Sequence, residues 1–319
     1  MNTFISCDWG TSAFRLRLVN AATKEVLATI KTDQGNAPVY NDWTNNHPQE
    51  DRLTFYSNIL ANGVQALEQE YKQSLANTTI VISGMASSSI GMMELPYKDL
   101  PLHLDGSDVL TEVIAPLPNF MHKILFISGA KTSEDVMRGE ETKLLGCEVE
   151  NKQEKQLLIL PGTHTKHVVV EGGIATEFKT YMTGELFNLL STKSVLAASV
   201  EKEDAKQGVD NTEFFIKGVT EAAGNNMLNS IFHVRTFRLF EYHSSQQNYQ
   251  YLSGLLVGSE LKDLIDKKYS SVMLVATGVL APLYRQALQT LNINVNKETD
   301  ADEALIAGQC KMYLQMTKQ

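Results

Sequence analysis

The amino-acid sequence predicts an α/β fold made of two duplicated domains that face one another across a cleft. The main observation is an internal repeat: a strand–turn–strand–turn–strand pattern near the N-terminus recurs so that Gly10-Thr11 aligns with Gly162-Thr163. In both halves this pattern is followed by helices that alternate with apolar strands. The length of 319 residues is also sufficient for two domains.

The first domain is expected to span residues 1–150 and to open with a three-stranded meander. The run 14–18 alternates apolar residues with arginines, which is the period of a half-buried strand. Ser133 is the expected N-cap of a helix over 134–147. The other expected elements are a loop at 32–48, a helix at about 50–75, strands at 79–83 and 123–128, and a mostly irregular stretch with short strands at 91–122.

The second domain is expected to span residues 151–319, with a polar interdomain crossing at 150–156. It should carry a helical insertion at about 185–268. The helices expected there lie at 185–190, 214–223, 227–240 and 249–266. The remaining elements are strands at 157–160, 166–170, 174–182 and 272–276, a helix at 279–291, an edge strand at 293–295 and a closing helix at 302–314.

Composition argues against several classes of protein. A formal net charge of −9 disfavours a nucleic-acid-binding surface, and no apolar run approaches the ~18 residues of a membrane span. The three cysteines lie far apart without metal-ligand spacing, so we expect free, buried thiols. No basic segment followed by an apolar one opens the chain. We therefore expect a cytoplasmic protein without nucleic-acid or membrane partners, and the sequence allows a homodimer.

The two glycine–threonine turns are the first candidate site. Small hydroxyl residues and glycine let backbone N–H groups approach an anion, and Asp8 could hold a hydrated Mg²⁺ that bridges to a phosphate. Two such turns at matched positions suit a polyphosphate with Mg²⁺. An ordinary hairpin with a polar turn is the alternative. The candidate phosphate-binding residues are Gly10, Thr11 and Ser12 in the first turn, and Gly162, Thr163, His164 and Lys166 in the second.

The charged segment 138–142 (RGEET) is the second candidate site. Adjacent carboxylates on a helix point about 100° apart, so only one of Glu140 and Glu141 would face the cleft. A carboxylate near a phosphate site could accept the proton of an acceptor hydroxyl. The alternative is a solvated helical face.

Two other turns, at Glu185 and at Thr277-Gly278, say less about function. Glu185 is expected to be a charge at a helix N-terminus rather than a catalytic group. Thr277-Gly278 joins an apolar strand to a helix, where glycine would let a flat ring or a phosphate approach, although a plain strand–helix turn fits equally well. The sequence contains no Ser-His-Asp elbow, no Walker P-loop and no Rossmann fingerprint.

Seven motifs lie in order along nearly the whole chain. They are DWGT at 8–11, SGM at 83–85, VMRGEET at 136–142, PGTHTK at 161–166, MTGEL at 182–186, LSGLLVG at 252–258 and ATG at 276–278. In these motifs the sequence resembles the 2-dehydro-3-deoxygalactonokinase family, within the actin/hexokinase/Hsp70-like ATPase superfamily. The third and fourth motifs are specific to that family, whereas the first is shared across the superfamily.

The resemblance implies two actin-like (ribonuclease H-like) domains facing a nucleotide cleft. It also implies ATP- and Mg²⁺-dependent phosphorylation of the terminal hydroxyl of 2-dehydro-3-deoxygalactonate, a step of galactonate catabolism. In superfamily terms, residues 8–12 and 162–166 match the two phosphate hairpins, 276–279 the adenosine-side turn, and 301–308 the second connecting helix. Thr277 stands before Gly278, where related chains often have paired glycines.

The resemblance also suggests which residues act. Many sugar kinases of the superfamily use an aspartate of the first connecting helix as the base, where this chain has glutamates. We therefore carry the role to Glu140 by position, with Glu141 as the alternative, and expect Asp8 to position Mg²⁺ through water. Closure of the halves would exclude water from the reaction. The candidate sugar-acid residues are Ser83, Gly84, Met85, Ser89 and, for the substrate carboxylate, Arg138.

Two other functions remain open from the sequence. A kinase of the same fold could act on another sugar or sugar acid, such as 2-dehydro-3-deoxygluconate, because one inverted hydroxyl changes only a contact or two. A nucleotide-driven binding module of the actin type would hydrolyse ATP without a small acceptor.

Overall fold

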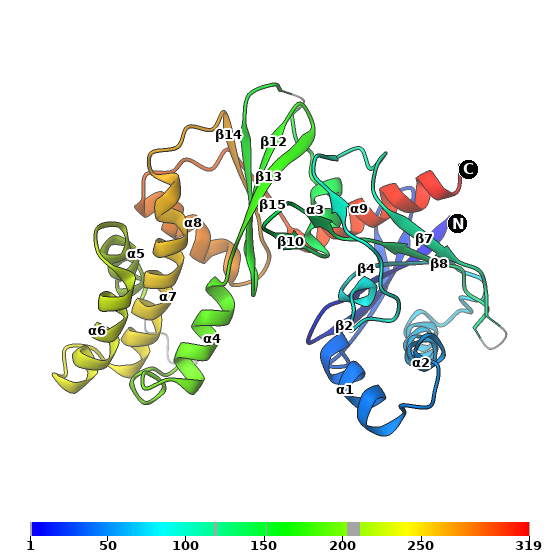
Figure 1. Cartoon of the computed structure of the whole chain (residues 1–319), viewed down its shortest axis with the longest axis horizontal. Helices are drawn as coiled ribbons and strands as arrows, with labels where there is room; N and C mark the ends of the chain where they lie inside the picture. The colour runs from blue at the N-terminus through cyan, green and yellow to red at the C-terminus, as the bar shows by residue number, and fades with distance from the viewer. Residues whose placement is uncertain (1, 118–119, 151, 203–210, 319) are drawn as a thin grey trace. The chain divides into compact units, whose positions relative to one another are not determined.

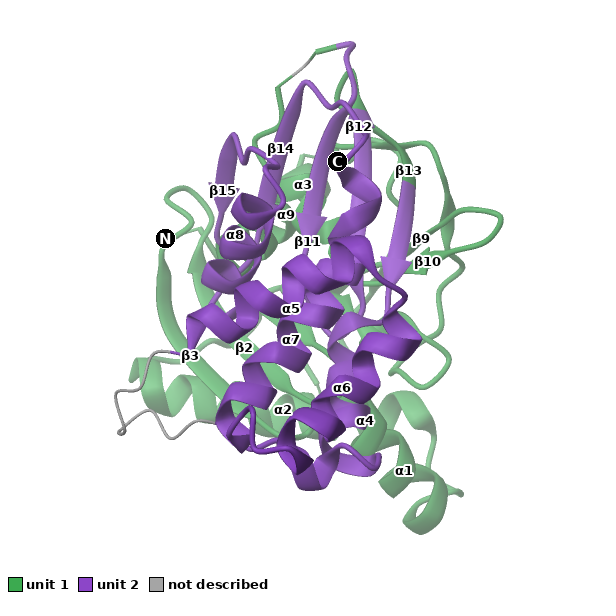
Figure 2. Ribbon diagram, turned by 90° about the vertical axis from the view of Figure 1, so that its left-hand side faces the viewer, with its two compact units in different colours: residues 1–152, 171–177, 301–319 green, residues 153–170, 178–300 purple. Residues whose placement is uncertain are grey.

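The structure, a computed structural model, describes residues 2–117, 120–150, 152–202 and 211–318 (Figure 1). The chain divides into two compact units, coloured separately in Figure 2. Unit 1 comprises residues 1–152, 171–177 and 301–319, and unit 2 comprises residues 153–170 and 178–300. The predicted crossing at 150–156 and the predicted insertion at 185–268 include residues 151 and 203–210, which lie outside the described residues.

Unit 1 contains a six-stranded sheet with the strand order β3-β2-β1-β4-β8-β7. β1 is antiparallel to β2 and parallel to β4, and β4 is parallel to β8. The central strands are buried because their residues are apolar on both faces of the sheet. The bounds are β1 Thr3–Trp9, β2 Phe14–Asn20, β3 Val26–Thr32, β4 Ile80–Gly84, β7 Thr111–Ile114 and β8 Ile124–Ile127.

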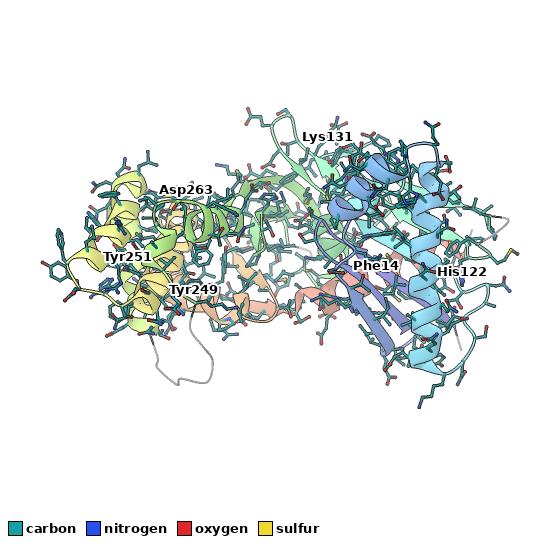
Figure 3. All side chains as sticks on the ribbon, turned by 90° about the horizontal axis from the view of Figure 1, so that it is seen from below. Phe14, His122, Lys131, Tyr249, Tyr251 and Asp263 are labelled. Carbon is teal, nitrogen blue, oxygen red and sulfur yellow. The ribbon has the colours of Figure 1, made fainter. Side chains whose placement is uncertain are left out.

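Helices cover both faces of this sheet. Phe14 of β2 packs between the sheet and α2 (Arg52–Tyr71), as Figure 3 shows, with Trp9 against its ring. The opposite face packs against α9 (Ala301–Met316), where Tyr313 stacks on Phe4 at 5.0 Å. The other elements of unit 1 are α1 Asn36–Asn46, α3 Glu140–Gly146, and the short strands β5 Lys98–Asp99, β6 Leu102–His103, β9 Ala130–Lys131 and β10 Val136–Met137.

Unit 2 repeats the strand order of unit 1. Its strands run in the order β13-β12-β11-β14-β15, which matches β3-β2-β1-β4-β8 of unit 1. β11 is antiparallel to β12 and parallel to β14, as β1 is to β2 and β4, and β14 is parallel to β15. This topology confirms the duplication that the sequence predicts. The strands are β11 Gln156–Leu160, β12 Thr165–Glu171, β13 Ile174–Tyr181, β14 Ser271–Val275 and β15 Lys297–Thr299. Residues 171–177, at the β12–β13 turn, belong to unit 1, where Ile174 and Ala175 pair with β6.

Helices of unit 2 pack on one face of its sheet and on each other. α5, α7 and α8 bury Leu157 and Ile159 of β11, whereas α6 packs mainly on α7. Most of the predicted helical segments are confirmed here, although their ends differ by a few residues. The bounds are α4 Thr183–Lys193, α5 Thr212–Gly224, α6 Met227–Leu239, α7 Ser245–Leu261 and α8 Leu280–Thr290.

The predicted helix at 134–147 is wrong in its first half. β10 pairs there with β9, and α3 begins only at Glu140. Gly139 precedes it with a φ of +107°, a backbone conformation that interrupts a helix. Ser133 is therefore not a helix N-cap, and Gly139 holds that position.

Two other expectations differ from the structure. The stretch 32–48, expected to be a loop, contains α1, whose first residue Asn36 is buried against the β1–β2 turn. The edge strand expected at 293–295 lies instead at 297–299 as β15. Asn292 has a left-handed backbone, and the side chain of Asn296 accepts a hydrogen bond from Val272 N at 2.8 Å, so pairing with β14 starts later.

The division into units also differs from the predicted boundary at 150/151, because α9 folds with unit 1. α9 crosses α3 at two glycines. A Cβ at Gly146 would lie 1.8 Å from the carbonyl oxygen of Ala304, and a Cβ at Gly308 would lie 1.9 Å from that of Thr142. The backbones of the two helices therefore touch, which only glycine permits.

Gly308→Ala should destabilise the protein by about 1–3 kcal/mol, because the new methyl group meets backbone that must move. The midpoint of urea denaturation, followed by circular dichroism, measures this. Gly224→Ala is the matched control, since a Cβ at this last residue of α5 meets nothing within 4 Å. Equal midpoints for Gly308→Ala and the control would contradict the close helix contact.

Candidate functional site

The first glycine–threonine turn connects β1 and β2 in unit 1. Asn36 at the start of α1 donates through its side chain to the carbonyl of Trp9 (2.8 Å) and through its backbone to that of Gly10 (2.9 Å), and Ala37 N donates to the carbonyl of Thr11 (3.0 Å). Because trans peptides point C=O and N–H in opposite directions, the N–H groups of Thr11 and Ser12 face away from α1. Thr11 and Ser12 are exposed.

Asp8 lies at the end of β1 beside two arginines of β2. Arg15 Nη1 is 3.9 Å from an oxygen of Asp8 and 2.8 Å from one of Asp302, and Arg17 Nη2 is 2.9 Å from the other oxygen of Asp302. Asp302 therefore pairs with both cations, and the Asp8 side chain keeps a third of its surface exposed. One accessible carboxylate fits a Mg²⁺ ion that keeps several waters and also binds phosphate oxygens.

A metal cage made only of protein is not found among the described residues, where no three His, Cys, Asp or Glu side chains are grouped to bind an ion. Mg²⁺ usually takes only one or two carboxylates besides substrate phosphates. The donor chemistry around Asp8 thus fits Mg²⁺ delivered together with a nucleotide.

Four of the residues expected to bind the sugar acid lie at the end of β4 (Ser83 and Gly84) and in the loop after it (Met85 and Ser89). Gly84 has a φ of +90° and starts a short turn at Met85–Ser87. Ser83 is fully buried, and its hydroxyl accepts a hydrogen bond from Gln309 Nε2 of α9 at 2.9 Å. Ser89 is exposed. Of the expected residues, Met85 and Ser89 are therefore more accessible than Ser83, whereas Ala86, Ser87 and Ser88 between them are buried.

Arg138 holds this loop in place. Its guanidinium lies 4.0 Å from the ring centroid of Tyr97, donates to the carbonyl and hydroxyl of Ser87, and donates to the carbonyl of Leu95 at 3.1 Å. These contacts occupy both terminal nitrogens. They favour a role in shaping the loop over direct binding of a substrate carboxylate.

Glu140 and Glu141 occupy different environments although they are adjacent. A Cβ at the preceding Gly139 would lie 3.2 Å from Gly84 Cα, so the start of α3 is next to the end of β4. Glu140 is partly exposed there. Glu141 is buried and accepts hydrogen bonds from Gly139 N (2.6 Å) and the Thr142 hydroxyl (2.9 Å). Burial, and then the charge of Glu140, raise the pKa of Glu141 to about 7.

The second glycine–threonine turn, residues 161–164 of unit 2, packs against the start of α4. A Cβ at Gly184 would lie 2.6 Å from the carbonyl oxygen of Gly162, and Glu185 N donates to the carbonyl of Thr163 at 3.0 Å. The side chains of His164 and Glu185 form a hydrogen bond. A Cβ at Gly162 meets nothing within 4 Å, so open space lies beside this glycine.

The other predicted nucleotide residues of unit 2 fall into two groups. Thr277 and Gly278 are exposed in the turn between β14 and α8, where Gly278 has a φ of +59°. Lys166 is buried in β12, and its Nζ donates to the Thr180 hydroxyl at 2.6 Å. Thr277 and Gly278 are thus accessible, whereas Lys166 supports the strand behind its turn.

Sequence reasoning missed several residues that support these turns. Asn36 and Gln309 lie in segments that carry no motif, and Asp302 contributes through its pairing with Arg15 and Arg17. The sequence indicated that Arg15 and Arg17, two arginines on the same face of a strand, need an acidic partner, but it did not indicate that this partner is Asp302. Such arginines need a carboxylate partner when they are covered.

Glu141→Gln should reduce the dependence of stability on pH. The native state holds a proton on Glu141 up to about pH 7, whereas a glutamate with its ordinary pKa of 4.5, as in the unfolded chain, loses the proton earlier. The stabilisation is therefore complete below about pH 4.5 and is lost as the pH rises through 7. Urea midpoints between about pH 5 and 8 should fall less for Glu141→Gln than for the wild type. Parallel pH profiles of the variant and the wild type would contradict this. The control is Glu134→Gln, which removes an exposed carboxylate a few residues before α3.

Comparison with known proteins adds to this geometry. A family model described as 2-keto-3-deoxy-galactonokinase matches residues 8–312. A probable 2-dehydro-3-deoxygalactonokinase of Rhizobium meliloti (strain 1021) is 30% identical over 313 residues, which covers 96% of this chain and 94% of that protein. The 2-dehydro-3-deoxygalactonokinase of Escherichia coli (strain K12) is 29% identical over 238 residues, 72% of this chain and 77% of that protein.

Solved structures show the same fold. A crystal structure of a Sinorhizobium meliloti protein that carries the same kinase name has a TM-score of 0.79 at 28% identity, and covers 98% of this chain and 99% of that one. The activator of the 2-hydroxyisocaproyl-CoA dehydratase from Clostridium difficile, solved with bound ADPNP, has a TM-score of 0.50 at 10% identity over 99% of this chain and 96% of that one. The likeness to the second protein concerns the fold alone, which is the actin-like ATPase and sugar-kinase fold.

Proposed function

The chain belongs to the 2-keto-3-deoxy-galactonokinase family, and from that premise we propose that it transfers the γ-phosphate of ATP to the terminal hydroxyl of 2-dehydro-3-deoxy-D-galactonate. The observation that carries this proposal is the family match over residues 8–312, which includes both glycine–threonine turns and the RGEET segment. The family is one of ATP-dependent sugar kinases, so ATP is the phosphate donor.

Glu140 is the proposed general base. Its carboxylate is partly exposed next to the end of β4, whereas Glu141 is buried and bound to Gly139 N and Thr142. Glu140 would accept the proton of the sugar-acid hydroxyl as the phosphoryl group arrives. Glu141 would fix the start of α3, and Arg138 would fix the loop that we propose for the sugar acid, including Met85 and Ser89.

The proposed ATP contacts are made mainly by backbone. N–H groups of the first turn, at Thr11 and Ser12, and of the second turn, at Gly162 and Thr163, would bind phosphate oxygens, and the exposed Thr277-Gly278 turn would contact the adenosine. Asp8 would hold Mg²⁺ through water. Bound Mg²⁺ supplies positive charge that neutralises the phosphates.

Cytoplasmic location and a homodimer remain proposals as well. Among the described residues, no helix is both long and apolar enough to cross a bilayer. α6 exposes Leu228, Phe232 and Leu239, which lie on one side of the helix and would be the first place to look for contact with a second copy.

A panel of sugar acids tests the substrate. In an assay coupled to ADP release, 2-dehydro-3-deoxy-D-galactonate should give the highest kcat/KM, and mass spectrometry should find one added phosphoryl group on the terminal oxygen. Higher kcat/KM for 2-dehydro-3-deoxygluconate would reassign the substrate within the same fold. ATP hydrolysis that no sugar acid stimulates would favour an actin-like binding module.

Glu140→Gln should lower kcat by roughly 10²–10⁴-fold with ATP affinity nearly unchanged, because a positioned general base commonly contributes that much. Steady-state kinetics and calorimetric titration with ATP measure the two quantities. The control variant Glu134→Gln, at an exposed position a few residues before α3, should retain the wild-type kcat. A wild-type kcat for Glu140→Gln would remove Glu140 from this role.

A further inference from the structure

We infer that Glu260 is a positioning residue for ATP: from the interior of unit 2, its carboxylate holds both ends of the second glycine–threonine turn in the conformation that binds phosphate. The inference concerns residues to which the proposed function gives no role. It rests on the proposed ATP role of residues 161–164, and the experiment below separates the two.

Glu260 is a buried carboxylate that three side chains satisfy. It lies near the end of α7 with 1% of its side chain exposed. His167 Nε2 donates to one of its oxygens at 2.9 Å, and the hydroxyls of Tyr284 (2.7 Å) and Thr183 donate to the other. A buried carboxylate is costly unless donors surround it, so the carboxylate and its three donors hold one another in fixed positions.

The donors come from three elements, α4, α8 and β12, and Thr183 of α4 makes the first connection to the turn. Thr183 is the first residue of α4, directly before Gly184 and Glu185, which contact the carbonyls of Gly162 and Thr163. Glu260 therefore holds the helix start on which the turn rests.

The second connection reaches the other end of the turn. Tyr284 of α8 gives its proton to Glu260, so the Thr165 hydroxyl donates to the oxygen of Tyr284 at 2.9 Å. Thr165 is the first residue of β12, directly after the turn. Burial, and then the charge of Glu260, raise the pKa of Tyr284, which keeps this hydroxyl a donor.

His167 makes the third connection from β12. The other two donors are hydroxyls, and an imidazole N–H donor at Nε2 completes the hydrogen bonds to the Glu260 carboxylate. His167 Nδ1 is buried without a hydrogen-bond partner among the described residues, so the ring's polar contact is the one to Glu260. Tyr181 of β13 packs on the ring at 4.5 Å. The ring is thus held in one orientation toward Glu260.

Close helix packing fixes the position of Glu260 itself. A Cβ at Gly254 would lie 2.0 Å from the carbonyl oxygen of Phe215, and one at Gly258 would lie 2.8 Å from that of Val219. α7 therefore lies directly on α5 just before Glu260, and such backbone contact leaves little freedom along the helix axis. A core that needed only stability would be served as well by apolar side chains.

Two variants remove single donors without creating large cavities. Thr183→Val and Tyr284→Phe should each weaken ATP binding about tenfold, as expected for loss of a hydrogen bond to a charged group, measured by calorimetric titration of the full chain with MgATP. The KM for the sugar acid should stay unchanged, because the turn contacts only the nucleotide in this proposal. Thr183→Ser, which keeps the hydroxyl, should restore the wild-type affinity.

Matched controls exclude a general loss of stability. Thr192→Val is the corresponding change at an exposed position of α4, where the hydroxyl bonds only within the helix. Tyr251→Phe removes the hydroxyl of another buried tyrosine of unit 2, labelled in Figure 3. Both controls should bind MgATP like the wild type, even where their urea midpoints fall as far as those of the two test variants.

Gly162→Val tests the proposed ATP site independently of Glu260. Its side chain would enter the open space beside the turn, where we propose that ATP binds, and should therefore weaken MgATP binding. If it weakens MgATP binding but Thr183→Val and Tyr284→Phe do not, Glu260 has no positioning role. If Gly162→Val also binds MgATP like the wild type, the ATP assignment of the turn is wrong. Equal effects of the test variants on the KM values for ATP and sugar acid would likewise overturn the inference.

Discussion

The backbone contact between α3 and α9 is the constraint on which the candidate site of unit 1 depends. Gly146 and Gly308 let the two helices touch, and this contact brings the C-terminal helix onto the sheet that the N-terminus begins. Asp302 can then pair with Arg15 and Arg17 beside Asp8. Residues from opposite ends of the chain thereby form the surroundings of a single, partly exposed carboxylate.

Unit 2 also contains two helices whose backbones touch at glycines. Gly254 and Gly258 bring α7 onto α5, and this close packing places a polar residue, Glu260, beneath a turn. In unit 1 the corresponding polar residue is Gln309, which bonds to Ser83 and to the carbonyl of Cys7. In both units, apolar packing determines where a helix lies, and a few buried polar contacts then determine the conformation of a loop.

The two adjacent glutamates show how strongly environment divides chemical roles. Glu140 and Glu141 are identical in covalent structure, but Glu141 alone is buried, and burial raises its pKa to about 7. A carboxylate that must meet substrate needs access, and Glu140 stays partly exposed although it accepts a hydrogen bond from Arg138 N at 3.2 Å. The proposed division into a base and a supporting residue follows from that difference.

The sequence by itself determined the duplication, the position of both glycine–threonine turns, most strands and the family, because these depend on local periodicity and on motifs. Only the tertiary structure decided that 136–137 is a strand, that α1 forms at Asn36, that α9 belongs to unit 1, and which glutamate is buried. Each of these depends on partners elsewhere in the chain: β10 needs β9, Asn36 needs the carbonyls of the first turn, and α9 needs two glycines. Local patterns report hydrogen bonding between near neighbours, whereas burial and pairing across the fold depend on residues that no local window contains.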